Sequence, residues 1–164
     1  MKSIGPLIAI GVALGVLLLF SIPQGTTTPV LAEDFTLESL AGESVTLSDY
    51  RGQVVILDFW ASWCSPCVET LPQLHALQQQ YADQGVVLLA VSIDRNVNSA
   101  TKFVESAGLS KDAFLWESRE ASLAVKELYH VGGIPKTFVI DRYGYIRFSA
   151  HPSYLTPEKL ETWL

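Results

Sequence analysis

Blocks of apolar residues alternate with polar stretches along this chain, and the length and spacing of each block predict a secondary-structure element. Residues 54–60 are apolar except at Asp58 and rich in branched and aromatic side chains, which is typical of a strand buried on both faces. Residues 86–93 form a second run of this kind. Between the two runs, leucines recur at helical spacing, so we predict a helix that begins near Cys64.

The remaining blocks are shorter, and each predicts one further element. We expect a β-hairpin from 35–37 and 45–47, helices over 98–107 and 121–129, a short strand at 114–116, strands at 137–140 and 146–149, and a last helix beginning at 156–158. Strands and helices therefore alternate. This order predicts an α/β fold with a central sheet covered on both faces.

The N-terminal part of the chain has a different pattern. Lys2 is the only charged side chain among the first thirty-two residues, and 4–22 is an uncharged, mostly apolar run of nineteen residues. That length suffices for a helix to cross a bilayer core of about 30 Å, and Lys2 predicts that the N-terminus stays inside. A cleaved signal peptide is the alternative, because 30–32 (Val-Leu-Ala) resembles a cleavage site.

These patterns divide the chain into three parts. We predict a membrane anchor or signal sequence at 1–23, a linker at 24–34 and a folded domain at 35–164. With either leader the domain lies outside the cytoplasm. It is then held at the membrane by the N-terminal helix, on the periplasmic or outer face, or is secreted after cleavage.

Composition and charge exclude several classes of protein. The chain has 164 residues, of which 49% are hydrophobic, so one domain with a buried core is expected. Its two cysteines are too few for a disulfide framework. A net charge of -6 argues against nucleic acid as a partner, because phosphate binding needs clustered Lys and Arg.

The candidate chemistry lies at Cys64 and Cys67. Two cysteines three positions apart at the start of a helix share one face and can form a disulfide. The helix N-terminus stabilises a thiolate, which is the reactive species, so Cys64 should attack first and Cys67 should resolve the mixed disulfide. As a purely structural disulfide the pair would restrain little of the unfolded chain, and a zinc site needs about four ligands.

Three segments resemble a known family. Residues 58–67, with Pro72 beyond them, resemble the active-site segment of thioredoxins. Residues 47–52 and 133–141 resemble the membrane-anchored, extracytoplasmic thiol-disulfide oxidoreductases of that superfamily, which include reductases that serve cytochrome c maturation. The resemblance covers 35–164. It implies a thioredoxin fold, with a central mixed β-sheet flanked by helices, an added N-terminal β-hairpin and a central αβ insertion.

The resemblance also implies roles for residues outside the cysteine pair. Pro135 is expected to be cis and to face Cys64 and Cys67, with the Ile134 backbone pairing to an extended substrate segment. Trp63 is expected to border the substrate surface, although a partly buried packing residue suits that position equally. No cofactor is expected beyond the redox-active cysteines.

Asp58 interrupts an apolar strand, and a buried carboxylate is costly without a partner or a task. Burial should raise its pKa and let it exchange a proton with Cys67, and thioredoxins carry a buried aspartate at this position. A satisfied structural aspartate is the alternative. One departure from the family stands nearby: many anchored reductases have glutamate three residues after the second cysteine, where this chain has Thr70, with Glu69 about 100° away around the helix.

These observations predict a reductase of disulfides in exported proteins that takes its electrons from a membrane thiol donor. An oxidant of the same fold, which would install disulfides, is the first alternative. A copper(I) or haem-delivery module is the second, although relatives of that kind space their cysteines more widely and add a histidine. Peroxide-reducing relatives carry threonine three residues before the reactive cysteine, where this chain has Ala61.

Overall fold

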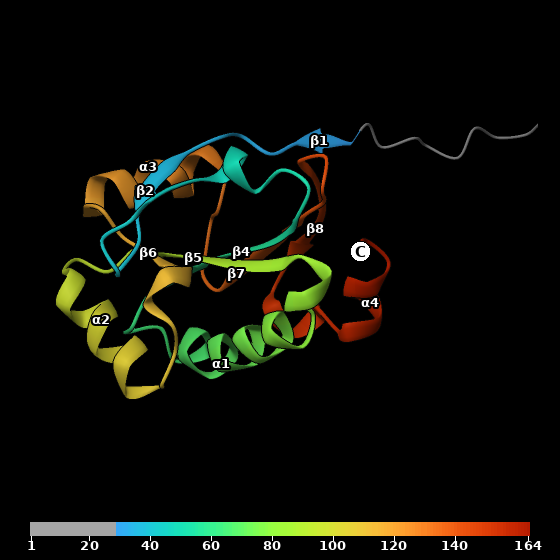
Figure 1. The fold of residues 1–164 in the computed structure, drawn as a ribbon. Helices are drawn as coiled ribbons and strands as arrows, with labels where there is room; N and C mark the ends of the chain where they lie inside the picture. Colours follow the sequence, from blue (N-terminus) through green and yellow to red (C-terminus); the bar gives the residue numbers. More distant parts are fainter. Residues whose placement is uncertain (1–28) are drawn as a thin grey trace, which may run out of the picture.

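The two long apolar runs form the centre of a mixed sheet. The computed structural model describes residues 29–164 (Figure 1). In it, β4 (Val54–Trp60) and β5 (Val86–Ser92) pair in parallel, with Val54 opposite Val86 and Trp60 opposite Ser92. Every residue of β4 is buried, as its apolar composition predicts for a central strand.

Four further strands extend this sheet on both sides. Next to β4 lie β7 (Lys136–Ile140) and then β8 (Tyr145–Ala150), both antiparallel to their neighbours. On the other side, β6 (Phe114–Leu115) pairs in parallel with β5. The strand order is β1-β8-β7-β4-β5-β6, so the predicted central mixed sheet is confirmed.

The outermost strand was not expected from the sequence. Residues Val30–Leu31, within the predicted linker, form β1 and pair with Ile146 and Tyr145 of β8. The next residue, Ala32, is buried and donates its backbone N–H to the carbonyl oxygen of Gly144 at 2.8 Å. The chain therefore joins the sheet before Phe35.

The predicted leader, 1–23, lies outside the described residues, as do 24–28 of the predicted linker. Within residues 29–164, no helix combines the length and apolar character needed to span a membrane.

The pleat of β4 separates two layers, which are visible above and below the sheet in Figure 1. Val55, Leu57 and Phe59 pack against the hairpin of β2 (Thr36–Glu38) and β3 (Ser44–Thr46) and against α3 (Arg119–Leu128). Val54, Ile56 and Trp60 face the opposite layer, which contains α1 (Ser65–Gln80), α2 (Val97–Ser106) and α4 (Pro157–Glu161). Short 3₁₀ helices span Leu47–Tyr50, Ala82–Gln84, Lys111–Ala113 and Pro152–Tyr154.

Most predicted elements are confirmed, and the differences lie at their ends. The hairpin pairs in antiparallel register around Leu37 and Val45, and α2 with β6 forms the predicted insertion beside β5. Helix α3 starts at Arg119 rather than at 121, because the Ser118 side chain caps it by accepting the backbone N–H of Ala121 at 3.0 Å.

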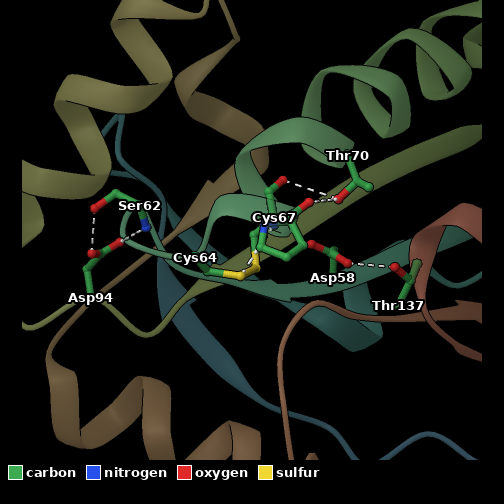
Figure 2. The surroundings of a disulfide bond; sticks show 8 residues. Asp58, Ser62, Cys64, Cys67, Thr70, Asp94 and Thr137 are labelled. Carbon is green, nitrogen blue, oxygen red and sulfur yellow. Dashed lines mark hydrogen bonds between the residues drawn. A yellow bond between two sulfur atoms is a disulfide. The ribbon is translucent and has the colours of Figure 1, made fainter.

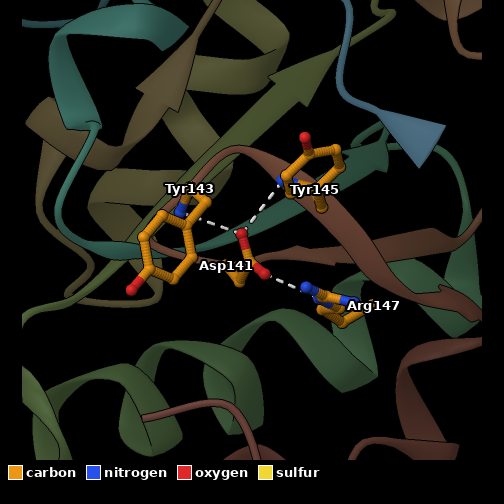
Figure 3. A network of polar contacts seen from close by, with 4 residues as sticks. All are labelled: Asp141, Tyr143, Tyr145 and Arg147. Atoms are coloured by element: carbon orange, nitrogen blue, oxygen red, sulfur yellow. Dashed lines mark hydrogen bonds and ion pairs between the residues drawn. The ribbon is translucent and has the colours of Figure 1, made fainter. Parts of the chain in front are cut away.

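The turn between β7 and β8 is stabilised by one carboxylate (Figure 3). Asp141 accepts hydrogen bonds from the backbone N–H groups of Tyr143 (2.9 Å) and Tyr145 (3.0 Å) and pairs with the Arg147 guanidinium at 2.6 Å. Burial acts to raise the pKa of Asp141, but these hydrogen bonds together outweigh it and lower the pKa. Gly144 completes the turn with φ at +91°, a conformation that favours glycine.

Candidate active site

The two cysteines lie at the first turn of α1, where the buried strand β4 ends (Figure 2). Cys64 is the N-cap, and its sulfur accepts the backbone N–H of Cys67 at 3.3 Å. Pro66 occupies the first turn, where a missing N–H costs nothing. The pair is joined as a disulfide, with Cα atoms 5.2 Å apart. The predicted geometry at the helix N-terminus is therefore present.

The two sulfurs differ in access to solvent. Cys64 is 7% exposed and Cys67 is fully buried, so Cys64 is the more accessible of the two cysteines. Beside it, Trp63 is 64% exposed, an unusual position for a large aromatic side chain. A slightly exposed attacking sulfur and a fully buried resolving sulfur suit sequential thiol–disulfide exchange.

Asp58 lies within the sheet, on the face that carries the cysteines. It alternates along β4 with Ile56 and Trp60, which pack in the α1 layer. Its Oδ1 accepts the Thr137 hydroxyl at 2.6 Å, and its Oδ2 has no hydrogen-bond partner among the described residues. Figure 2 shows the carboxyl group between the disulfide and Thr137.

The environment of Asp58 disfavours its charged form. Burial raises its pKa to about 8, although the hydrogen bond from Thr137 acts to lower it. At neutral pH this carboxyl group is mainly protonated, and its conjugate base is much stronger than that of an ordinary aspartate. The side chain can therefore take up or release a proton near physiological pH.

The segment before β7 completes the site. The Ile134–Pro135 peptide bond is cis, as the resemblance implies. Ile134 is partly buried and packs against the cluster that contains Cys64 and Cys67. Two residues further on, Thr137 lies opposite Asp58 in the β4–β7 register, so one segment contacts both the cysteine cluster and the buried acid.

Comparison with known proteins agrees with this geometry. The profile of the AhpC/TSA family matches residues 30–149. The chain belongs to this family. Among its relatives are thiol-disulfide oxidoreductase ResA of Geobacillus kaustophilus, 37% identical over 77% of this chain and 68% of that protein, and ResA of Bacillus subtilis, 32% identical over 76% and 65%.

Solved structures support the same assignment. A protein from Chlorobium tepidum assigned as the thiol:disulfide interchange protein DsbE superposes with a TM-score of 0.71 at 33% identity, over 82% of this chain and 93% of that one. The predicted thioredoxin fold and the predicted activity, thiol–disulfide oxidoreduction, are thereby confirmed at the level of reaction class.

Three residues after the second cysteine, this AhpC/TSA-family chain has Thr70 and therefore no carboxylate. Thr70 is buried, and its hydroxyl lies 2.9 Å from the Pro66 carbonyl oxygen and 3.2 Å from that of Cys67. Glu69 is exposed on the outside of α1. The threonine therefore serves the backbone of the cysteine turn, and Asp58 is the acid on the cysteine side of the sheet.

One residue of the site was missed by the sequence analysis. Asp94, just after β5, is 1% exposed. Its carboxylate accepts the Ser62 backbone N–H (2.9 Å), the Ser62 hydroxyl (2.7 Å) and the Ser92 hydroxyl (2.8 Å). It thus fixes the segment that leads into Cys64, as Figure 2 shows. The usable signal was its place after a buried strand parallel to β4, because the carboxyl ends of such strands share one edge of the sheet.

Within 29–164, no three or more His, Cys, Asp or Glu side chains come together in a group that could hold a metal ion.

Proposed function

We propose that this protein is an extracytoplasmic reductase of disulfides in exported proteins, with substrates such as those of cytochrome c maturation. The observation that carries the proposal is the pairing of a slightly exposed cysteine with a fully buried one, next to a buried acid whose pKa is about 8. The chain's similarity to ResA proteins agrees with it. The uncharged run 4–22 supports a location at the outer face of a membrane.

The reaction begins with the reduced pair. The Cys64 thiolate, stabilised by the helix N-terminus, attacks one sulfur of the substrate disulfide. A Cys64–substrate disulfide forms, the substrate S–S bond breaks, and the other substrate sulfur leaves as a thiolate that takes a proton. Ile134 and Pro135 align the substrate segment, and Trp63 borders it.

Resolution uses the buried groups. Cys67 loses its proton to Asp58 in the ionised form of that side chain, which is the minor form at neutral pH, and the resulting thiolate attacks Cys64. The Cys64–Cys67 disulfide forms, and the second substrate thiolate leaves, so two electrons pass from the protein to the substrate. A membrane thiol donor then reduces the Cys64–Cys67 disulfide. Tethering would favour this step, because it keeps the protein near the donor in surroundings that are otherwise oxidising.

The reduction potential of the Cys64–Cys67 pair tests the direction of electron flow. The full chain, solubilised in neutral detergent, is equilibrated with thiol buffers, and the reduced fraction is measured by thiol alkylation. A value near or below about −270 mV, as in thioredoxin, is expected for a reductase. A value near about −120 mV would identify a disulfide-forming oxidant and overturn the proposal.

Trapping tests the order of attack. In Cys67→Ala the mixed disulfide cannot resolve, so Cys64 should accumulate covalent adducts with substrate proteins, visible on non-reducing gels. The matched variant Cys64→Ala should accumulate far fewer, because Cys67 is fully buried. Equal trapping by both variants would contradict the assigned roles.

A further inference from the structure

A cleft of about 740 Å³ opens beside the cysteine pair, and apart from Trp63 none of its lining residues takes part in the steps above. Ser62 and Trp63 form one wall, so the cleft begins directly before Cys64 in the chain. The opposite walls come from the segment after β5, from α2 and from α3. Ile93 and Leu123 supply apolar surface within it.

The cleft is basic on a protein that is acidic overall. Arg95, Arg119 and Lys126 line it, whereas the net charge of the chain is -6. Asp94 is the one acidic residue of the lining, and both of its carboxylate oxygens already accept hydrogen bonds from Ser62 or Ser92.

The positive groups are free to bind a ligand. The ion pairs of the described residues join Lys111 to Glu105 and Arg147 to Asp141, and neither involves a cation of the cleft. The Arg119 Nε is buried and has no hydrogen-bond partner in the described part of the chain. Arg119 as a whole is only partly buried and lines the cleft, and the other N–H donors of its guanidinium suit a carboxylate supplied from outside.

Two helix ends add to the positive potential. The N-cap of α2, Asn96, and the first residue of α3, Arg119, both line the cleft. Each helix spans ten residues and carries partial positive charge at this end. The cleft therefore combines fixed dipoles, three cations and an exposed indole.

We propose that this cleft binds an acidic segment of the substrate polypeptide, next to the disulfide that is being exchanged. The inference rests on the proposed function and adds a substrate preference to it. A polypeptide whose cysteine is bonded to Cys64 passes Trp63, so carboxylate side chains near that cysteine can reach Arg95 and Arg119. A planar guanidinium binds a carboxylate in bidentate fashion, and complementary charge speeds encounter.

Binding is tested without redox chemistry. The oxidised full chain in neutral detergent is titrated with a short cysteine-free peptide rich in Glu, and with the same peptide in which every Glu is Gln, using calorimetry. We expect the acidic peptide to bind at least about fivefold more tightly at low salt, with the preference lost near 0.5 M NaCl because salt screens exposed charges. Equal affinities at low salt would overturn the inference.

Variants locate the binding surface. Arg119→Gln and Arg95→Gln should each lower the ratio of the two affinities, and the double variant should bring it close to one. Lys159→Gln makes the same charge change on α4, which lies away from α2 and α3 (Figure 1), and should leave the ratio unchanged. A preference that survives the double variant, or that Lys159→Gln removes equally, would place the peptide elsewhere.

A second pair of peptides, with the same acidic and neutral sequences placed beside a disulfide, separates the two proposals. If both peptides are reduced at equal kcat/KM and neither binds more tightly, the reductase proposal is supported and the proposed role of the cleft is overturned. If the acidic peptide binds more tightly but neither peptide is reduced, the cleft is supported as a binding surface and the reductase proposal is overturned.

Discussion

At the scale of single residues, Asp58 sets the chemistry apart from an ordinary surface disulfide. It is fully buried, one oxygen accepts the Thr137 hydroxyl, and the other has no partner in the described chain. A carboxyl group in such a place is costly when charged. Burial raises its pKa to about 8, so the energetic cost of ionising this side chain affects the protein in the pH range where the site would work.

Asp58→Asn should make the protein more stable at neutral and alkaline pH. The pKa of Asp58 is raised on folding, so its contribution to the free energy of unfolding is complete below the unfolded pKa, 3.8, and declines until the pH passes about 8. The variant lacks this loss, so its free energy of unfolding should exceed that of the native chain by a few kcal/mol at pH 8. One pK unit corresponds to about 1.4 kcal/mol. Urea unfolding at several pH values measures the difference, which should vanish near pH 4.

Asp58→Asn should also slow the resolution of the mixed disulfide. Losing a positioned base typically costs about 100-fold or more in rate, and the dependence of the rate on a group with pKa about 8 should disappear. Thr137→Val is the matched control. It retains the acid but removes the hydrogen bond that lowers the pKa, so the apparent pKa should move upward. A downward shift, or no change in rate for the asparagine variant, would contradict the role of Asp58.

At the scale of elements, the site depends on contacts between segments that are distant in the chain. Asp94 follows β5, yet it holds the Ser62 backbone and hydroxyl just before α1. The indole N–H of Trp116, after β6, donates to the Asp94 carbonyl oxygen at 3.0 Å. The approach to Cys64 is therefore fixed by the ends of two neighbouring strands.

Asp94→Ala should destabilise the fold and loosen the approach to Cys64. Ser62 would lose its acceptor in a part-buried place and Ser92 in a fully buried one, and the loss at a buried group typically costs about 1–3 kcal/mol. Thermal and urea unfolding measure the loss. Asp112→Ala, on an exposed 3₁₀ turn, is the control and should change stability by less than about 0.5 kcal/mol. Similar losses in both variants would show that the Asp94 contacts contribute little.

At the scale of the whole molecule, the two layers share one sheet. Residues of β4 point alternately into the layer of the hairpin and α3 and into the layer of α1 and α2. The hairpin is also bridged to β6 through Ser39 and Leu115. The domain should therefore unfold as one cooperative unit.

Leu37→Ala tests this cooperativity. Leu37 lies in the hairpin and is 1% exposed, so the cavity should cost about 2–5 kcal/mol. Tryptophan fluorescence, to which Trp60 on the opposite face of β4 contributes, and far-UV circular dichroism should report the same lowered midpoint. Separate midpoints would show that the hairpin layer unfolds independently of the cysteine layer.

Many elements of this fold, and its reacting cysteine pair, can be predicted from local sequence. The alternation of apolar runs and amphipathic segments predicts β4, α1, β5 and the hairpin, because periodicity records which faces are buried. The cysteine pair and its chemistry follow equally, since Cys64 and Cys67 are neighbours on one turn. Asp58 is conspicuous because it is the only charged residue in an apolar strand.

Other features depend on tertiary structure alone. The Thr137 partner of Asp58, the Asp94 contacts to Ser62, the β1 strand and the basic cleft each join residues from separate segments. Strand order and register decide which of these residues meet, and local hydrophobic patterns encode only which face of each strand is buried. The sequence by itself therefore determined the elements and the reacting pair, whereas the environment that tunes the pair and the surface beside it arose only from the packing of distant segments.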